Sequence, residues 1–139
     1  MYSNGHSAGT IESGHTYKLT HGRTRTVLDL SAKDWQSIKS AAWEASDYQK
    51  WVAEEAGSGG RWTFRNVATG LYLGVDGAPR PNAPVIATRT ETAWDIQPGR
   101  EPSSVVLIAA GTRLCAQPGE GARVKLGEIG SGEWRVEHA

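Results

Sequence analysis

The sequence predicts an all-β protein built from three four-stranded repeats. Glycine and tryptophan are both abundant, with 17 and 6 residues, whereas phenylalanine and methionine each occur once. Short apolar runs alternate with small or polar turn residues, as expected for a chain of short strands. These runs recur about every forty residues along the chain. The length of 139 residues suits one domain that can bury a core.

The first half of each repeat holds two apolar strands joined by a turn. The three segments are "TYKLTHGRTRTVLDLS", "RWTFRNVATGLYLGVDG" and "SVVLIAAGTRLCAQPG". Their alignment places Leu19, Phe64 and Val105 in the first strand and Leu28, Leu73 and Leu114 in the second. The two positions are nine residues apart in every segment, and both advance by 45 and then 41 residues. This shared spacing indicates a true internal repeat.

The second half of each repeat aligns in the same order. Ile38, Val85 and Val124 mark a third strand, and Trp51, Trp94 and Trp134 mark a fourth. The tryptophans are 43 and then 40 residues apart, and the first repeat carries extra residues around "SAAWEASDY". Three units with four strands each predict about twelve short strands.

Helical solenoids and propellers also have repeats of this length. Residues 32–56 have the most helical composition, but Ile38, Trp43 and Trp51 do not share one helical stripe. Three blades are too few for a stable propeller. A β-trefoil with pseudo-threefold symmetry, in which six strands close a barrel and three hairpins cap it, leaves few exposed strand edges. We expect a flexible N-terminal tail over residues 1–13 and the β-trefoil over 14–139, with repeats at about 14–56, 57–100 and 101–139.

The three recurrent tryptophans are predicted to be core residues. A tryptophan at the start of each fourth strand buries a large apolar area near the pseudo-axis. Of the motif "QKW", Gln49 is therefore the residue with a possible role beyond packing.

Composition excludes several classes of partner. The formal net charge is +0 and the pI about 6.9, so the chain has no bulk field that attracts nucleic acid or an anionic membrane. No apolar run is long enough for a transmembrane helix, so membrane insertion is not expected. The first residues lack the apolar region of a signal peptide, which favours a cytoplasmic location and leaves unconventional secretion open. The single cysteine, Cys115, is expected to be buried and unreactive.

Two stretches resemble a known family. "TVLDLSAKDWQSIKSAAWEASDYQKW" is similar to the first repeat, and "GRWTFRNVATGLYLGVDG" to the second repeat, of ricin-B-type (R-type) lectin domains, in particular the small single-domain fungal forms. The resemblance covers about residues 14–138. It implies a β-trefoil that binds sugars through an aspartate, a stacking aromatic residue and polar groups beside a Gln-x-Trp motif.

Carried over to this chain, the resemblance implies one sugar site in the first repeat. Its carbohydrate-binding residues are Asp29, Trp43, Asp47, Tyr48 and Gln49. Asp29 would accept hydrogen bonds from sugar hydroxyls and Trp43 would stack on the ring. Tyr48 replaces the usual asparagine, which alters the polar set. Trp35 is a second candidate aromatic residue.

The other two repeats depart from the pattern. In the second repeat Asp76 falls near the aspartate position and Thr92 replaces glutamine, while Arg80 and Asn82 are alternative polar groups. The third repeat has Gln117 at the aspartate position and Gly132 at the glutamine position. We therefore expect at most one familiar site, and an agglutinin would need a homodimer.

No motif indicates catalysis, a metal or a cofactor. His6, His15, His21 and His138 lack the spacing of metal ligands. The chain has neither a nucleophile elbow nor a phosphate-binding loop, so neither enzymatic activity nor a cofactor is expected.

Three functions remain. The leading hypothesis is a lectin for galactose- or N-acetylgalactosamine-type glycans. The second is a protein-binding trefoil without sugar affinity, such as a protease inhibitor or a lectin-like companion subunit, acting through residues 76–84 or 21–26. The third is a glycan-binding module separated from an enzyme.

Overall fold

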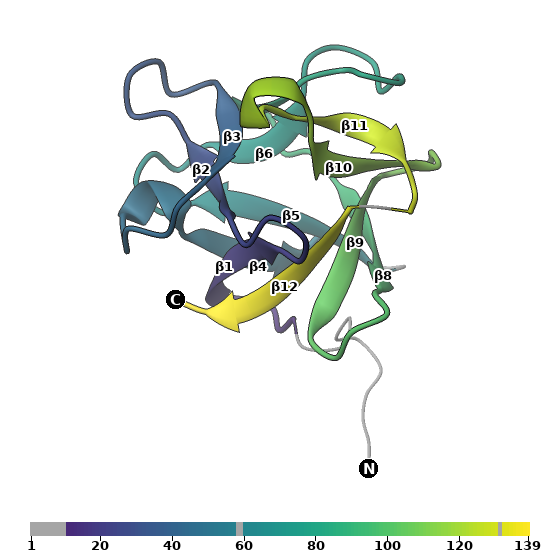
Figure 1. The fold of residues 1–139 in the computed structure, drawn as a ribbon, viewed down its shortest axis with the longest axis horizontal. Coiled ribbons are helices and arrows are strands. Elements are labelled where there is room, and N and C mark those ends of the chain that lie inside the picture. Colours follow the sequence, from purple (N-terminus) through teal and green to yellow (C-terminus); the bar gives the residue numbers. More distant parts are fainter. Residues whose placement is uncertain (1–10, 58–59, 131) are drawn as a thin grey trace.

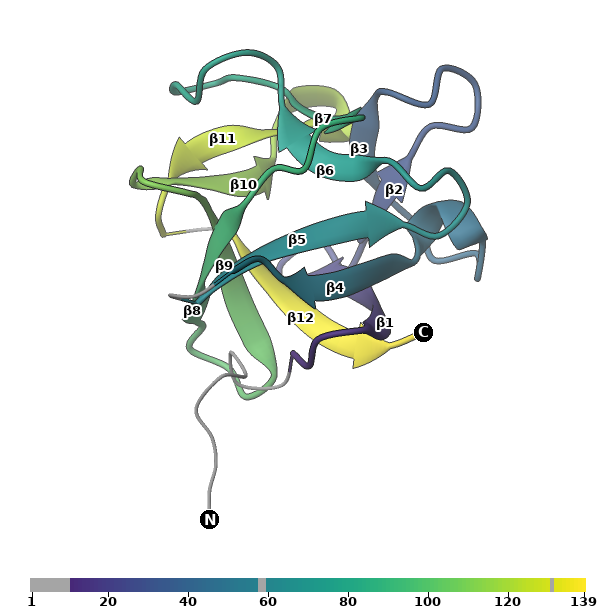
Figure 2. The same cartoon turned by 180° about the vertical axis from the view of Figure 1, so that it is seen from behind.

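The computed structural model describes residues 11–57, 60–130 and 132–139, which form twelve strands and two short 3-10 helices (Figures 1 and 2). Unit 1 contains β1 (His15–His21), β2 (Val27–Leu30), β3 (Ile38–Ala41), η1 (Asp47–Gln49) and β4 (Trp51–Glu55). Unit 2 contains β5 (Arg61–Asn66), β6 (Tyr72–Val75), β7 (Val85–Thr88) and β8 (Trp94–Pro98). Unit 3 contains β9 (Ser104–Ala109), β10 (Leu114–Pro118), η2 (Glu120–Ala122), β11 (Val124–Glu128) and β12 (Glu133–His138).

Six strands close a barrel. In ring order they are β1, β4, β5, β8, β9 and β12, and every neighbouring pair is antiparallel, including β12 with β1. The first and last strands of the chain therefore lie side by side, as Figure 1 shows. Closure pairs both edges of each barrel strand and so removes the exposed edges of an open sheet.

Three hairpins cap one end of the barrel. They are β2–β3, β6–β7 and β10–β11, one from each unit. Isolated bridges join each hairpin to the other two, at Ser37 with Ile86, Lys39 with Arg123 and Pro84 with Lys125. A six-stranded barrel with three mutually bridged hairpins is a β-trefoil, and the predicted fold class is confirmed.

Strand register corrects one part of the repeat alignment. Opposite the tryptophans Trp51, Trp94 and Trp134 lie Tyr17, Trp62 and Val105. The residue equivalent to Leu19 and Phe64 is therefore Leu107, not Val105. A shift of two residues keeps a side chain on the same face of a strand, so the apolar pattern alone could not reveal the error. The third-strand alignment of Ile38, Val85 and Val124 agrees with the register.

The recurrent tryptophans are core residues, as predicted. Trp51, Trp94 and Trp134 are fully buried in one apolar cluster that draws on all three units. Their indole N–H groups donate to carbonyls on the second strand of the same unit: Trp51 to Leu28 at 3.1 Å, Trp94 to Leu73 at 2.9 Å and Trp134 to Ala116 at 2.9 Å. These bonds satisfy the one polar atom of each buried ring and identify Ala116, not Leu114, as the equivalent of Leu28.

The packed domain includes residues that precede position 14. Residues 1–10 of the expected tail lie outside the described residues. Ile11 is fully buried in the main core, and the Glu12 N–H donates to the Tyr17 hydroxyl at 2.8 Å. Ile11 is thus part of the folded domain, because its apolar side chain is buried in the main core.

Cys115 is buried, as expected, and burial raises the pKa of its thiol. The thiol therefore remains protonated near neutral pH and behaves as a small apolar side chain. Within the described ranges, the chain has no helix that could cross a membrane.

Candidate functional site

Gln49 organises the predicted site in unit 1. Its side chain is fully buried at the end of η1, just before β4 begins. The amide nitrogen donates to the Ala42 carbonyl at 2.8 Å and to Asp29 Oδ2 at 3.1 Å. The amide oxygen accepts from the Glu44 N–H at 2.8 Å. Gln49 therefore holds the main chain on both sides of Trp43 and fixes Asp29 at the same time.

Asp29 lies on β2, half-buried beside the segment that carries Trp43. Burial raises the pKa of its carboxyl, the hydrogen bond from Gln49 opposes that rise, Glu44 adds to it and Lys39 lowers it. Oδ2 is engaged by Gln49, whereas Oδ1 has no hydrogen-bond partner in the described part of the chain. Asp29 therefore has one carboxylate oxygen oriented by Gln49 and a second that is available to accept a hydrogen bond.

Trp43 is 36% exposed, which is high for so large an apolar side chain. The Lys18 ammonium lies 4.5 Å from its ring centroid, in cation–π contact with one face. The opposite face of an indole held in this way can stack on the apolar side of a sugar ring. The structure thus brings together Asp29, Trp43 and Gln49 of the five predicted residues, through the bonds of Gln49.

The other predicted residues of unit 1 have different surroundings. Asp47 is exposed, and its carboxylate pairs with Lys50 at 3.2 Å. Tyr48 packs partly against the main core, and its carbonyl accepts from Asn66 at 3.0 Å. Trp35 is 49% exposed in the β2–β3 loop, and its backbone is left-handed with φ of 55°. Asn66 lies in the stretch "RNVATG" that resembles the family but was not predicted as a site residue, and its buried amide links η1 to the β5–β6 turn.

In unit 3 a glutamine amide occupies the position that Asp29 has in unit 1. Register makes Gln117 equivalent to Asp29, and Glu128 equivalent to Ala42. Gln117 Nε2 donates to the Glu128 carbonyl at 3.0 Å, the bond that Gln49 makes in unit 1. Gly132 occupies the position of Gln49, and a Cβ there would lie 2.9 Å from the Ala116 carbonyl oxygen. No carboxylate is left in this position.

Unit 2 fills the equivalent position with threonines. Gly74, not Asp76, is the residue equivalent to Asp29, since it lies one residue after Leu73 and opposite Ile86. A Cβ at Gly74 would lie 2.8 Å from side-chain atoms of both Thr88 and Thr92. Asp76 is exposed two residues further on, where the hairpin loop begins.

The alternative polar residues of unit 2 are engaged within the protein. Arg80 donates to the carbonyls of Asp76 and Ala78 at 3.3 Å, so its guanidinium folds back on its own loop. Asn82 accepts a hydrogen bond from Lys125 at 2.9 Å. These contacts reduce the availability of the loop 76–84 as an inhibitory loop.

Among the described residues, one group of side chains could hold a metal ion. Glu12, His15 and His138 are exposed, and their ligand atoms lie within 4.8 Å of one another. His15 Nδ1 is 3.7 Å from Glu12 Oε1, and the two imidazole centroids are 5.6 Å apart. Sequence spacing could not reveal this cluster, because the β1–β12 pairing brings His15 and His138 together from opposite ends of the chain.

Comparison with known proteins agrees with the fold. A ricin B-like lectin of Macrolepiota procera, solved in complex with lactose, superposes with a TM-score of 0.88 and 24% identity, over 94% of this chain and 99% of that one. The Rhizoctonia solani agglutinin gives 0.84 and 23%, over 93% and 98% of the two chains. A designed threefold-symmetric protein, ThreeFoil, gives 0.80 and 17%, over 89% and 99%.

The sequence comparisons identify the family. No curated protein sequence matches significantly. The profile described as "Ricin-type beta-trefoil lectin domain-like" matches residues 7–88, more than half of the chain, including unit 1 and most of unit 2. The chain therefore belongs to the family of ricin-type β-trefoil lectin-like domains.

Proposed function

We propose that this protein is a lectin that binds galactose- or N-acetylgalactosamine-type glycans through unit 1. The observation that carries the proposal is the Gln49 bond set, which orients Asp29 and the Trp43 segment together. Family membership and the lactose complex of the Macrolepiota procera lectin support a sugar ligand with a terminal galactose.

Each residue has a distinct role in this proposal. Asp29 Oδ1 accepts hydrogen bonds from ring hydroxyls, and Trp43 covers the apolar face of the same ring. Galactose-type sugars suit this pair, because an axial 4-hydroxyl leaves a continuous apolar face on one side of the ring. Gln49 positions the other two residues and has no free amide donor for the sugar, since both of its donor contacts are to the protein.

A single site per chain has a consequence for valency. The aspartate position is glycine in unit 2 and glutamine in unit 3, so we assign no sugar to either unit. A monomer would then bind glycans without cross-linking cells, and agglutination would require a homodimer.

The test is a calorimetric titration with galactose- and N-acetylgalactosamine-terminated disaccharides. Asp29→Ala should weaken binding at least tenfold, because it removes the hydroxyl acceptor. Asp76→Ala is the matched control, since Asp76 is an exposed aspartate outside the site, and it should bind as the wild type does. The proposal fails if the wild type binds neither sugar, or if Asp29→Ala binds as tightly as the control.

A further inference from the structure

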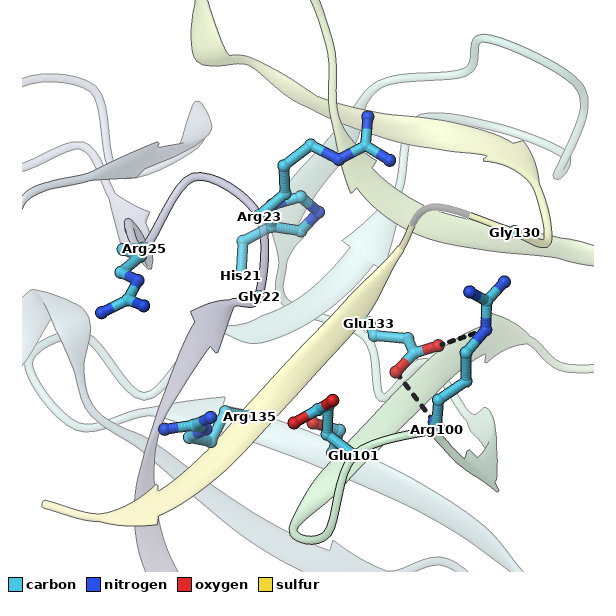
Figure 3. Close-up of a pocket in the computed structure, with 10 residues that line it drawn as sticks. His21, Gly22, Arg23, Arg25, Arg100, Glu101, Gly130, Glu133 and Arg135 are labelled. Carbon is cyan, nitrogen blue, oxygen red and sulfur yellow. Dashed lines mark hydrogen bonds and ion pairs between the residues drawn. The ribbon is translucent and has the colours of Figure 1, made fainter.

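A large hollow of the described surface lies between units 1 and 3. It has a volume of about 510 Å³ and lies between the β1–β2 turn, the β8–β9 turn and β12 (Figure 3). Its charged lining residues are Arg23, Arg25, Arg100, Arg135, Glu101 and Glu133. A second hollow of about 270 Å³ shares His21, Gly22, Arg25 and Arg135 with it and extends to Lys18 and Trp43. The two hollows are adjacent, since they share these four residues, and together are here named the arginine groove.

The arginine groove carries excess positive charge. Four arginines face two glutamates in the larger hollow. Arg100 is paired with Glu133, at 3.7 Å, and Figure 3 shows this carboxylate turned toward Arg100. In the described part of the chain Arg23, Arg25 and Arg135 have no ion-pair partner. In the smaller hollow Lys18 adds a cation, and Glu137 accepts from the Thr20 hydroxyl at 3.3 Å. A chain with no net charge thus gathers unpaired guanidinium groups on one concave surface.

The fold does not require the cation at Lys18. Register makes Lys18, Thr20, Val27 and Trp43 equivalent to Val106, Ile108, Cys115 and Ile129 of unit 3. In unit 3 three of these residues form a separate buried apolar cluster: Val106, Ile108 and Cys115. The position of Lys18 is therefore apolar in unit 3, so barrel closure does not explain a cation at this end of the groove. Planar guanidinium groups bind sulfate and carboxylate groups through paired hydrogen bonds.

We propose that the arginine groove binds the oxyanion of an acidic oligosaccharide, a sulfate ester or a carboxylate, next to the sugar in the unit 1 site. Arg25 and Arg135 are the central residues, because they line both hollows. Trp43 and Lys18 stand where the groove meets the site, so one extended ligand can occupy both. The placement of the neutral sugar of this ligand rests on the function proposed above, whereas the oxyanion contact does not depend on Asp29.

The test compares three oligosaccharides with one backbone: neutral, sulfated and carboxylated. The wild type should bind at least one acidic form roughly tenfold more tightly than the neutral form, and added salt should reduce that advantage. The two acidic forms distinguish sulfate from carboxylate. Equal affinity for all three would overturn the proposal.

Variants locate the effect. The double variant Arg25→Ala with Arg135→Ala should lose the advantage of the acidic form and keep the affinity for the neutral form. The double variant Arg113→Ala with Arg123→Ala removes the same charge from exposed positions outside the groove and should keep the advantage. An equal loss in both double variants would mean that net charge alone is responsible, and would overturn the proposal.

A competition experiment tests nucleic acid as the alternative ligand. Tighter competition by a short single-stranded oligonucleotide than by the acidic glycans would also overturn the proposal, in favour of nucleic acid.

Asp29→Ala separates this proposal from the proposed function. If both hold, this variant loses the neutral ligand and keeps weak, salt-sensitive binding of the acidic one. If neutral binding persists in Asp29→Ala while the arginine variant still loses the acidic preference, the groove stands and the assignment of the unit 1 site fails.

Discussion

Units 1 and 3 each have a glutamine that donates a hydrogen bond to the same backbone carbonyl position, but the glutamine comes from a different place in each unit. In unit 1 the amide of Gln49 donates to the Ala42 carbonyl, and the position on β2 is occupied by Asp29. In unit 3 the amide of Gln117 comes from the β2-equivalent position itself and reaches the Glu128 carbonyl, while Gly132 replaces Gln49. An amide donates to this carbonyl in both units, whereas only unit 1 has a carboxylate at the β2 position. The hydrogen bond to this carbonyl is thus common to the two units, whereas the carboxylate on which the proposed sugar site depends is particular to unit 1.

The largest expected effect is the loss of stability on removing the buried tryptophan of unit 1 or unit 3. Trp51→Ala and Trp134→Ala each remove a fully buried indole and its hydrogen bond, so each should lower the free energy of unfolding by about 3–5 kcal/mol. Urea unfolding measures both. Similar losses would show that the tryptophans are architectural whether or not their unit has a site, whereas a small loss at Trp134 would contradict this equivalence.

The next effect should separate stability from binding in unit 1. Gln49→Ala leaves the Ala42 carbonyl and the Glu44 N–H without their partner, so we expect a loss of about 1–3 kcal/mol in the free energy of unfolding. Because the Trp43 segment and Asp29 are then no longer fixed together, disaccharide affinity should also fall. Gln117→Ala is the matched variant in unit 3 and should reduce stability alone. A Gln49→Ala protein with full affinity would contradict the positioning role.

A similar loss of stability is expected when a side chain is added at Gly132, the unit 3 residue at the position of Gln49. Gly132→Ala would place a Cβ 2.9 Å from both the Ala116 carbonyl oxygen and the Cys115 sulfur, so about 1–3 kcal/mol should be lost. Gly22→Ala is the control, since its nearest contact would be 3.8 Å away and its φ is ordinary. Thermal unfolding compares the two variants. Equal stability would show that unit 3 still has space for a side chain at this position.

The smallest effect concerns pH. Burial raises the pKa of Asp29, so on acidification this carboxyl takes up its proton at a higher pH than an unfolded aspartate would. Sugar affinity should therefore fall as the pH drops through this raised pKa. The contribution of Asp29 to stability has the opposite sense: it decreases as pH rises from the unfolded value of 3.8 through the folded pKa, because burial disfavours the charged form. Titration of affinity against pH, with Asp29→Asn as the pH-insensitive reference, measures the first effect.

Sequence reasoning reached the fold because large apolar residues recur with the period of the trefoil. It misaligned unit 3 by two residues at Val105 and Leu114, because a shift of two leaves the face of a strand unchanged. It could not show that Gln117 takes over the hydrogen bond of Gln49, since Gln117 lies on β10 and Gln49 lies at the end of η1.

Long-range pairing explains the features that the sequence did not predict. Arg25 and Arg135 are 110 positions apart in the chain, and closure of the barrel by β1 and β12 places both on one groove. The pair His15 and His138 depends on the same closure. The side-chain types were visible in the sequence, but their proximity follows only from strand pairing.

The most direct test follows the six indole N–H signals by NMR during titration with a galactose-terminated disaccharide. A sugar bound between the Asp29 carboxylate and the Trp43 ring should shift the Trp43 signal strongly and leave the signals of Trp51, Trp94 and Trp134 nearly unchanged. Binding should saturate at one sugar per chain. Binding that leaves Trp43 unchanged, or that saturates at three sugars, would show that recognition does not reside in unit 1 alone.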